Sequence, residues 1–485
     1  MPASTKNKLY EDNINAWELV RDCVAGSEAV KCARYSQTEN SVVGLYNMTG
    51  AKYLPVPNPS DTSQDNVDRY TSYKQRANFV NFTGSTKEGF LGMINRKEPV
   101  IELESSIEYM ENNANGAGLG LAQLIQGATD ETLEVGRHGL LSDFPISEAG
   151  QNKASTSNLK STIKQYPAES IINWRESVID GETILSMVVL TEEVEKVDLD
   201  GFSSECVTYH RVLFLEDSIY KQRLYDEDDN LVTFEEDGEQ TGDIIPRKAD
   251  GSAWSFIPFK FIGAMNNDPE PDKSPLYDIA EINVAHYRNS ADFEESSFMI
   301  GQPTPVIAGL NQAWVTEVLK GGVMFGSRTA ILLPEGASAN LLQANPNQMP
   351  TQGMEIKEKQ LIAVGAKIIS DSSGVETAEA AKIRFAGQNS KLALVVTNVE
   401  SAIIDVLEWC SLYMGGGGES LVEINKQFYD ATINPQLLMA EIQLMDRNVI
   451  TKYDVRGRLR KTGLIEHDRT DEEIDDEAVE VSPLL

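Results

Sequence analysis

The spacing of hydrophobic residues changes along the chain and predicts helices first, strands in the middle and long helices afterwards. Residues 67–141 have a helical pattern, apart from a short extended stretch after Pro99. Between residues 170 and 262, runs of β-branched and aromatic residues are separated by turn residues, which is typical of an antiparallel meander. The acidic segment 226–230 is predicted to be one of its hairpin turns. Together these patterns predict an α+β fold.

The segment after Ser274 is predicted to be a long helix with one narrow hydrophobic stripe. Its apolar or aromatic positions recur at spacings of three and four on an otherwise polar rod. A small domain cannot bury such a stripe, whereas copies of the chain arranged around a symmetry axis can. The positions of the stripe are Leu276, Ile279, Ile282, Ala285 or His286, Asn289 and Phe293.

The next part of the chain is predicted to contain a mixed insert and two more long helices. Extended pieces at 304–309 and 329–334 flank a short helix, and the second long helix is expected across 354–369. A third, very apolar helix is expected from Ser390 to Met414, where four consecutive glycines end it.

The C-terminal part combines a predicted basic helix with an acidic tail. Residues 468–485 carry eight acidic side chains and one arginine, so we expect residues 466–485 to be disordered. The basic side chains of the preceding helix have two interpretations. They form a solvated face that pairs with the acidic tail, or they form a surface that contacts nucleic acid. These basic residues are Lys452, Arg456, Arg458, Arg460 and Lys461.

The chain is strongly acidic, with 75 acidic against 42 basic side chains and a formal net charge of −33. Such a surface repels free nucleic acid and anionic membranes at long range. Its four cysteines have no paired spacing and predict buried free thiols. The first residues lack the apolar region of a signal peptide, and the most apolar stretch contains Glu400 and Asp405. We therefore expect a protein made in the cytosol without membrane segments.

The sequence contains no motif of a familiar catalytic class. The phosphate-binding loop GxxxxGK[ST], the zinc motif HExxH and the nucleophile elbow GxSxG are all missing. The four histidines are isolated, and Leu231 stands where a calcium loop would need glycine. We therefore expect a protein that is not an enzyme and that holds no metal or cofactor. An acidic hydrolase with a dispersed active site is the alternative.

Two groups of segments resemble a known family. The N-terminal third contains WELVRDCVAGSEAVK (17–31), AKYLP (51–55), the stretch 70–99 and LEVGRHGLLSDFP (133–145) in that order. Residues 257–374 then give IPFKFIGAMNN, a long helix, a strand–helix–strand insert, a second long helix and a glycine-containing turn, followed by ETAEAAKIR. This wording and order resemble a branch of tailed-bacteriophage portal proteins otherwise catalogued only as a domain of unknown function. The resemblance spans residues 15–465.

The resemblance implies a portal-like fold with a mixed wing of helices and antiparallel sheet, a two-helix stem, a small α/β clip, a tunnel loop and little or no crown. The implied parts are a wing over 1–274, a first stem helix over 275–302, a clip over 303–347, a second stem helix over 348–370, a tunnel loop over 371–389, further wing helices over 390–465 and the acidic tail over 466–485.

The resemblance also implies a structural function. Portal subunits of this family form a dodecameric ring at one capsid vertex of the virion, and viral DNA passes through the ring during genome packaging and ejection. The implied partners are other copies of the chain, double-stranded viral DNA, the terminase motor, the head–tail adaptor and the major capsid protein, with no membrane. An acidic channel suits this function because it does not bind a phosphate polymer tightly. Another capsid-associated connector or scaffold-binding protein is the alternative.

Several residues are candidates for contacts in such a ring. Trp314 and Val318 lie four positions apart on the short clip helix and are candidates for docking the motor or adaptor, although this face also fits an internal core of the clip. Lys382 and Arg384 in the tunnel loop, and Lys391 after it, are candidates for DNA contacts in the channel. The basic residues at 452–461 would form a DNA-facing collar.

Overall fold

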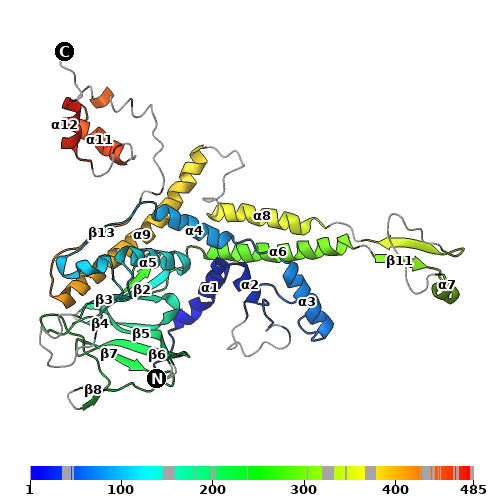
Figure 1. Cartoon of the computed structure of the whole chain (residues 1–485), viewed down its shortest axis with the longest axis horizontal. Helices are drawn as coiled ribbons and strands as arrows, with labels where there is room; N and C mark the ends of the chain where they lie inside the picture. The colour runs from blue at the N-terminus through cyan, green and yellow to red at the C-terminus, as the bar shows by residue number, and fades with distance from the viewer. Residues whose placement is uncertain are drawn as a thin grey trace. The chain divides into compact units, whose positions relative to one another are not determined.

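The computed structural model describes most of the chain in two units, 1–424 and 425–485. The described residues are 2–34, 45, 48–145, 159–179, 181–197, 201–202, 204–236, 239–302, 304–318, 333–343, 347–365, 378–426, 428, 439, 443–445, 447, 449–461, 465 and 469–480. The first unit contains a body of helices and sheets, from which a stem of two long helices extends (Figure 1).

The N-terminal part of the body is helical, as the spacing predicts. Several of its helices begin at a residue whose side chain accepts a hydrogen bond from the first turn, such as Asn7 before α1 and Ser63 before α3. The helices are α1 (Lys8–Ala25), α2 (Ser27–Cys32), α3 (Gln64–Arg76), α4 (Phe82–Ile94), η2 (Ser105–Glu111) and α5 (Leu121–Val135).

A three-stranded antiparallel sheet lies at the centre of the body, and its middle strand corrects the expectation of helix up to residue 141. Strand β2 (Arg137–Asp143) pairs with β10 (Phe259–Gly263) on one side and with β3 (Thr162–Pro167) on the other. Almost all of β2 is buried, so its sequence lacks the alternation that marks a half-exposed strand. A side chain at Gly139 would meet the Phe259 ring at 2.5 Å, which explains the glycine in this strand.

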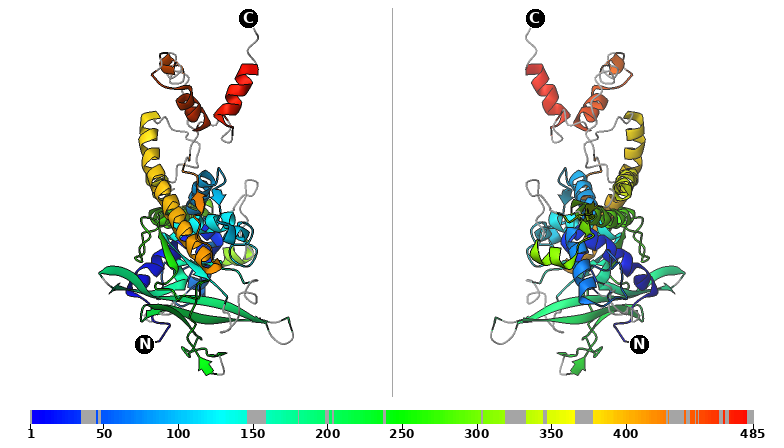
Figure 2. Two further views of the ribbon diagram at one scale, coloured as in Figure 1. Left: turned by 90° about the vertical axis from the view of Figure 1, so that its left-hand side faces the viewer. Right: turned by 90° about the vertical axis from the view of Figure 1, so that its right-hand side faces the viewer.

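The predicted antiparallel meander is confirmed. Strands β4 (Ile171–Ile179), β5 (Glu182–Val197), β6 (Ser204–Glu216) and β7 (Ile219–Tyr225) pair in sequence order. The segment 226–230 is a turn in which the Asp226 carboxylate accepts hydrogen bonds from the backbone of Asp228 and Asn230. The outer parts of β5 and β6 pair with each other beyond the reach of β4 and β7, so they form a ribbon that projects from the sheet (Figure 2).

A mainly aromatic core joins this meander to the three-stranded sheet and to helix α9 (Ala378–Met414). Trp254 lies 4.8 Å from the Tyr413 ring, and Tyr413 stacks on Phe144 at 5.4 Å. After α9, strand β13 (Leu421–Glu423) pairs with β1 (Val100–Glu102) and fastens the end of the first unit to its N-terminal part. Two short strands, β8 (Phe234–Glu236) and β9 (Glu239–Thr241), form a separate hairpin.

The stem consists of α6 (Tyr277–Gly301) and α8 (Met349–Val364), which pack along one another (Figure 1). Between them lies the tip, made of β11 (Thr304–Ala308), α7 (Gln312–Glu317) and β12 (Ser338–Leu342). Strand β11 pairs with β12, which follows the extended piece expected at 329–334. Most of 329–334 lies outside the described residues.

The expected boundaries differ at α9 and in the tail. Helix α9 begins at Ala378, so residues 378–389 are helical where a loop was expected, because AEAAKIR consists largely of strong helix formers. Residues 371–377 lie outside the described part of the chain. In the second unit, α11 (Lys452–Lys461) is followed by α12 (Asp471–Glu480), so the expectation of disorder is wrong for residues 471–480.

All four cysteines are free thiols, but only Cys23 and Cys410 are buried. The expectation of burial is wrong for Cys32 and Cys206, which are exposed. Cys206 lies on the projecting ribbon, where neither edge is covered by another strand. Within the described residues, no helix is both long and apolar enough to cross a membrane.

Candidate functional site

The first half of α6 is embedded in the body of its own chain. It packs against α1, α3 and α4, and the buried Asn283 connects it to α4. The Asn283 Oδ1 atom accepts hydrogen bonds from the Thr83 backbone and hydroxyl at 3.1 and 3.0 Å, and its Nδ2 donates to the Val80 carbonyl at 2.8 Å. Leu276 and Ile279 are therefore buried without another copy, which corrects the expectation for this part of the stripe.

The two stem helices approach closely where small and polar side chains meet. A side chain at Gly353 of α8 would lie 2.2 Å from the Asn289 amide nitrogen of α6, so glycine permits this approach. One turn away, the buried His286 Nε2 lies 3.6 Å from Glu358 Oε1. Burial lowers the pKa of His286, and Glu358 opposes that effect. The seam is thus tight midway along α6 and holds a histidine whose neutral form is favoured by burial.

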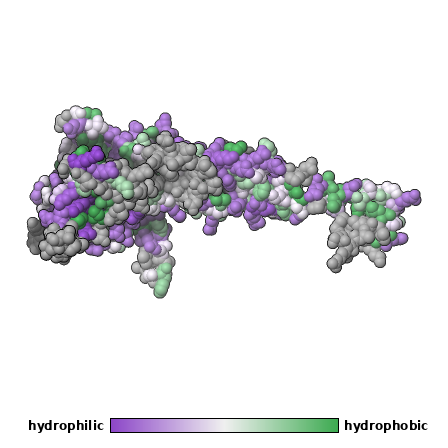
Figure 3. Space-filling view, turned by 90° about the horizontal axis from the view of Figure 1, so that it is seen from above, coloured by the Kyte–Doolittle hydropathy of each residue, from purple (hydrophilic) through white to green (hydrophobic). Residues whose placement is uncertain are grey.

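The far half of the stem and the tip leave apolar side chains exposed, as Figure 3 shows at the narrow end of the molecule. Met349 is 70% exposed and Leu342 is 68% exposed. Hydrophobic side chains that stay this exposed over a continuous part of a chain commonly mark an interaction surface. The exposed apolar residues of this far half and of the tip are Phe298, Met299, Val306, Val315, Val318, Leu341, Leu342 and Met349. We call this set the distal apolar surface.

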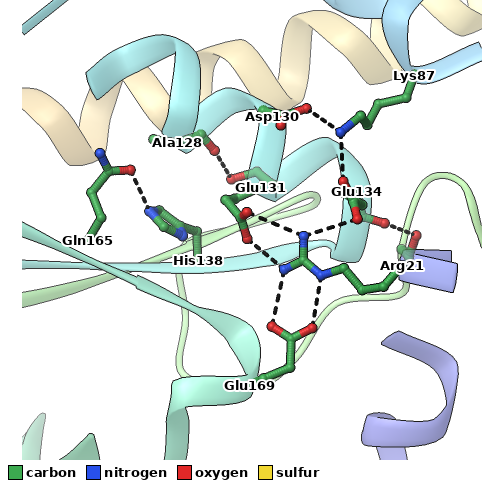
Figure 4. Close-up of polar contacts among 11 residues, drawn as sticks. Arg21, Lys87, Ala128, Asp130, Glu131, Glu134, His138, Gln165 and Glu169 are labelled. Carbon is green, nitrogen blue, oxygen red and sulfur yellow. Dashed lines mark hydrogen bonds and ion pairs between the residues drawn. The ribbon is translucent and has the colours of Figure 1, made fainter. Parts of the chain in front are cut away.

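A network of charged side chains fixes α1 beside the stem base (Figure 4). Arg21 of α1 makes ion pairs with Glu131 at 2.6 Å, Glu169 at 2.9 Å and Glu134 at 3.1 Å. Lys87 of α4 joins it through Glu134 at 2.7 Å. Burial lowers the pKa of Arg21, but its hydrogen bonds to Glu169 and Glu131 outweigh this effect and raise the pKa. Arg21 therefore holds α1, α5 and the start of the meander together.

The connection between the body and α6 is anchored by a buried arginine. The Arg137 guanidinium lies 4.2 Å from the Trp174 ring centroid and 4.5 Å from that of Phe261, and its Nη1 donates to the Pro269 carbonyl at 2.6 Å. Burial lowers the pKa of Arg137 to about 9, and Asp268 and Asp272 oppose this. Sequence reasoning missed Arg137, since no local pattern reveals an arginine between two distant aromatic residues.

The candidate residues of the clip and channel lie in different environments. Trp314 is half-buried on α7, and Val318 follows the helix with 44% of its surface exposed. Lys391 is exposed on α9. Lys382 and Arg384 belong to the same helix, but their side chains lie outside the described part of the structure.

The basic residues of α11 pair with the acidic tail. Lys452 and Arg456 contact the Asp475 carboxylate at 2.6 and 2.7 Å, and Arg460 contacts Asp471 at 2.6 Å. These are the ion pairs that the first of the two interpretations expects. The side chains of Arg458 and Lys461 lie outside the described residues. Among described side chains, no group of three or more His, Cys, Asp or Glu residues is placed to hold a metal ion.

Comparisons with known proteins give similarities of sequence and structure. Residues 275–414, from the stem to the end of α9, match the family model described as "Domain of unknown function (DUF4055)". No curated protein matches the chain. A chain of "Virion of native gene transfer agent (GTA) particle" is similar with 15% identity and a TM-score of 0.40, covering 80% of this chain and 92% of that chain. A chain of "Neck of empty GTA particle computed with C6 symmetry" has 14% identity and a TM-score of 0.38, covering 81% and 92%.

Proposed function

We propose that this chain is the portal subunit of a tailed bacteriophage. Copies of it form a closed ring at one capsid vertex, and double-stranded DNA passes through the ring during packaging and ejection. The distal apolar surface carries this proposal, because its side chains stay exposed among the described residues even though Tyr73 and Arg76 of α3 bond to the far half of α6. The resemblance of the N-terminal segments and of the order helix, insert, helix to portal proteins supports it.

Ring closure explains why these side chains stay exposed in one chain. In a cyclic assembly, each subunit presents one side of its stem to the next, and no contact is left open. Among the described residues, β11 and β12 form a sheet of two strands, so their outer edges could pair with strands of a neighbour. A net charge of −33 on each copy opposes this association, so we expect assembly to improve with added salt or divalent cations.

The ring is tested by native mass spectrometry and end-on negative-stain images of the purified chain over a range of salt concentrations. We expect closed rings with a central hole and a single subunit number, twelve if the family resemblance holds. A compact monomer at micromolar concentration under every salt condition would overturn the proposal. A different small oligomer without a hole would favour another capsid-associated connector.

Within this function, the tip is the docking surface for the terminase motor and later for the head–tail adaptor. Its helix α7 presents Val315 and Val318 to solvent on the narrow end of the stem. Replacing residues 303–347 by a short Gly/Ser link should leave the body folded and abolish binding of motor and adaptor. Substituting only Val318 by Ser tests the α7 face separately. Persistent binding after the replacement would show that docking takes place elsewhere.

The start of α9 is proposed to face the channel. Lys382, Arg384 and Lys391 would then meet phosphates of the moving DNA, each weakly, because tight binding would slow translocation. The double substitution Lys382→Ala with Arg384→Ala should preserve ring assembly and change the packaging yield. An unchanged yield with intact rings would exclude a channel role for this pair.

A further inference from the structure

The second unit contains two short helices whose charges match in spacing. Lys452, Arg456 and Arg460 follow one another at intervals of four on α11, so they form one row with a spacing of about 6 Å along the helix. Asp471 and Asp475 of α12 are also four positions apart. The three cations and two carboxylates therefore form a ladder of opposite charges.

Every described cation of this row is engaged by α12. The Asp475 carboxylate accepts hydrogen bonds from Lys452 and Arg456, and the Asp471 carboxylate accepts one from Arg460 at 2.6 Å. Arg456 also donates to the Asp471 carbonyl at 3.3 Å, and Arg460 donates to the Arg469 carbonyl at 3.0 Å. The hydrogen bonds from Arg456 and Lys452 lower the pKa of Asp475. The acidic helix thus occupies the positions that any other anion would need on α11.

Both helices have their own start signals. Thr470 and Glu473 bond reciprocally at the start of α12, where the Thr470 backbone donates to the Glu473 carboxylate and the Glu473 backbone donates to the Thr470 hydroxyl. Thr451 and Asp454 make the same arrangement at the start of α11. Helix α12 is therefore specified locally, with its aspartates held in a fixed row.

The ion pairs between α11 and α12 are weak enough for a polyanion of higher charge density to displace α12 from α11. The Lys452 side chain is 48% exposed and the two aspartates are 28% and 32% exposed, whereas the Arg456 and Arg460 side chains are 15% and 17% exposed. Because the carboxylate of every pair reaches solvent, each pair contributes on the order of 1 kcal/mol. Double-stranded DNA presents one charge about every 1.7 Å along its axis and releases bound counterions when cations replace them. Two aspartates cannot match this charge density when DNA is held nearby.

We propose that the basic row of α11 is a binding face for double-stranded DNA and that α12 is its internal competitor, which occupies the phosphate positions until DNA displaces it. The choice of DNA among polyanions rests on the proposed portal function. The masked row would explain how a strongly acidic chain keeps a basic surface without binding nucleic acid prematurely.

The test uses the full chain with Asp471→Asn and Asp475→Asn, which removes the competitor's charge at nearly constant size. Fluorescence anisotropy with a short random-sequence duplex measures affinity as a function of salt. We expect affinity to rise at least tenfold, and the slope of log affinity against log salt to steepen by up to about three, one for each freed cation. The control Glu227→Gln with Asp228→Asn removes two charges from an exposed turn and should change affinity less than twofold.

Two further variants keep the result decisive. A chain ending at Arg469 removes α12 altogether and should show the same gain, so loss of helix in the first variant does not hide the effect. Adding Lys452→Gln, Arg456→Gln and Arg460→Gln to the aspartate variant should cancel the gain. Unchanged DNA affinity in both unmasked chains would overturn the inference, as would a gain that survives loss of the three cations.

The outcomes also separate this inference from the portal assignment. A gain in DNA affinity without rings under any condition would support the masked face and reject the portal function. Rings without a gain in DNA affinity would support the portal function and reject the masked DNA-binding face. If the unmasked chain binds an added peptide of residues 470–485 but not DNA, the natural partner of α11 is the acidic helix of another copy, and the proposal for DNA fails.

Discussion

The two halves of helix α6 have the same secondary structure but different surroundings. Residues 277–291 are mostly buried among α1, α3, α4 and α8, and even their polar side chains Asn283 and Ser290 bond to the body. Residues 292–301 bond to α3 through Asp292 and Glu295, but they leave Phe298 and Met299 exposed. The first half therefore contributes to the stability of one chain, whereas the second half is available to stabilise an assembly.

The difference shows that an apolar stripe predicts burial but does not identify the partner that provides it. The near half of the stripe is covered by helices that are distant in sequence. Beyond it, α3 meets α6 through Tyr73 and Arg76 and leaves Phe298 and Met299 exposed. Substitutions along α6 and its supports therefore separate the two roles. The expected effects of these substitutions on the free energy of unfolding range from large to negligible.

The largest effect is expected at Tyr287, which is fully buried and meets Phe79 edge-on at 5.7 Å. Tyr287→Ala should lower the free energy of unfolding by about 3–5 kcal/mol, because it leaves a cavity between α6 and the body. Tyr287→Phe is the matched control. The buried hydroxyl has no hydrogen-bond partner among described residues, so its removal should cost little. Urea unfolding of the unassembled chain measures both variants. Equal losses of unfolding free energy would show that the volume of the tyrosine side chain is unimportant.

The second effect concerns Arg21 in the network beside the stem base. Arg21→Met should lower the free energy of unfolding by about 2–3 kcal/mol, because Glu134 is left largely buried with only Lys87 as a cation. Arg21→Lys keeps one charge but cannot reach three carboxylates, so an intermediate loss is expected. An unchanged free energy of unfolding in Arg21→Met would mean that the network is solvated and that α1 is held by apolar contacts alone.

The third effect depends on pH and belongs to the body. Burial lowers the pKa of His138 from 6.5 to about 4, and the hydrogen bond that its Nε2 makes to the Gln165 side-chain oxygen opposes this. Between these two values the unfolded chain binds a proton that the folded chain does not. Stability therefore falls as pH falls, by about 1.4 kcal/mol per pH unit from this group. His138→Gln should flatten the pH dependence over this interval, and parallel curves for the two proteins would contradict the assignment.

The smallest effect on unfolding is expected on the distal apolar surface. Met299→Ser with Met349→Ser should change the free energy of unfolding by less than about 0.5 kcal/mol, since both side chains are exposed. The same pair should abolish rings in native mass spectrometry. The control pair Val178→Ser with Met265→Ser removes equally exposed apolar groups outside the stem and should leave rings intact. Equal loss of rings in both pairs would remove the special role of the stem.

Much of the fold follows from local pattern, and the exceptions have physical reasons. The meander is recognisable because runs of β-branched and aromatic residues are separated by turn residues, and the long helices have regular spacing. Strand β2 is buried on both sides and mixes two leucines with Arg137, His138 and Ser142, so its sequence has no alternation that would indicate a strand. Helix α12 forms despite its acidic net charge, because the pattern Thr470-x-x-Glu473 marks a helix start. Net charge alone predicts disorder here.

The candidate site was less predictable from sequence. Pairing of α11 with the acidic tail was one of two interpretations, because opposite charge is visible in sequence but which residues meet is not. The distal apolar surface could not be separated from the rest of the stripe, since that depends on where α1, α3 and α4 end in space. The contacts of Lys382 and Arg384 remain predictions.

Helix α9 has a mechanical consequence that its sequence position does not suggest. Its 37 residues extend about 55 Å as one rod. The part from Leu392 onward is packed against α5, β2 and β10 and is fastened by an ion pair between Asp405 and Lys260 at 2.7 Å, whereas its first turns project from the body (Figure 1). We expect a force applied to these first turns to reach the core around Tyr413 through the helix itself, because the helix is continuous from one to the other.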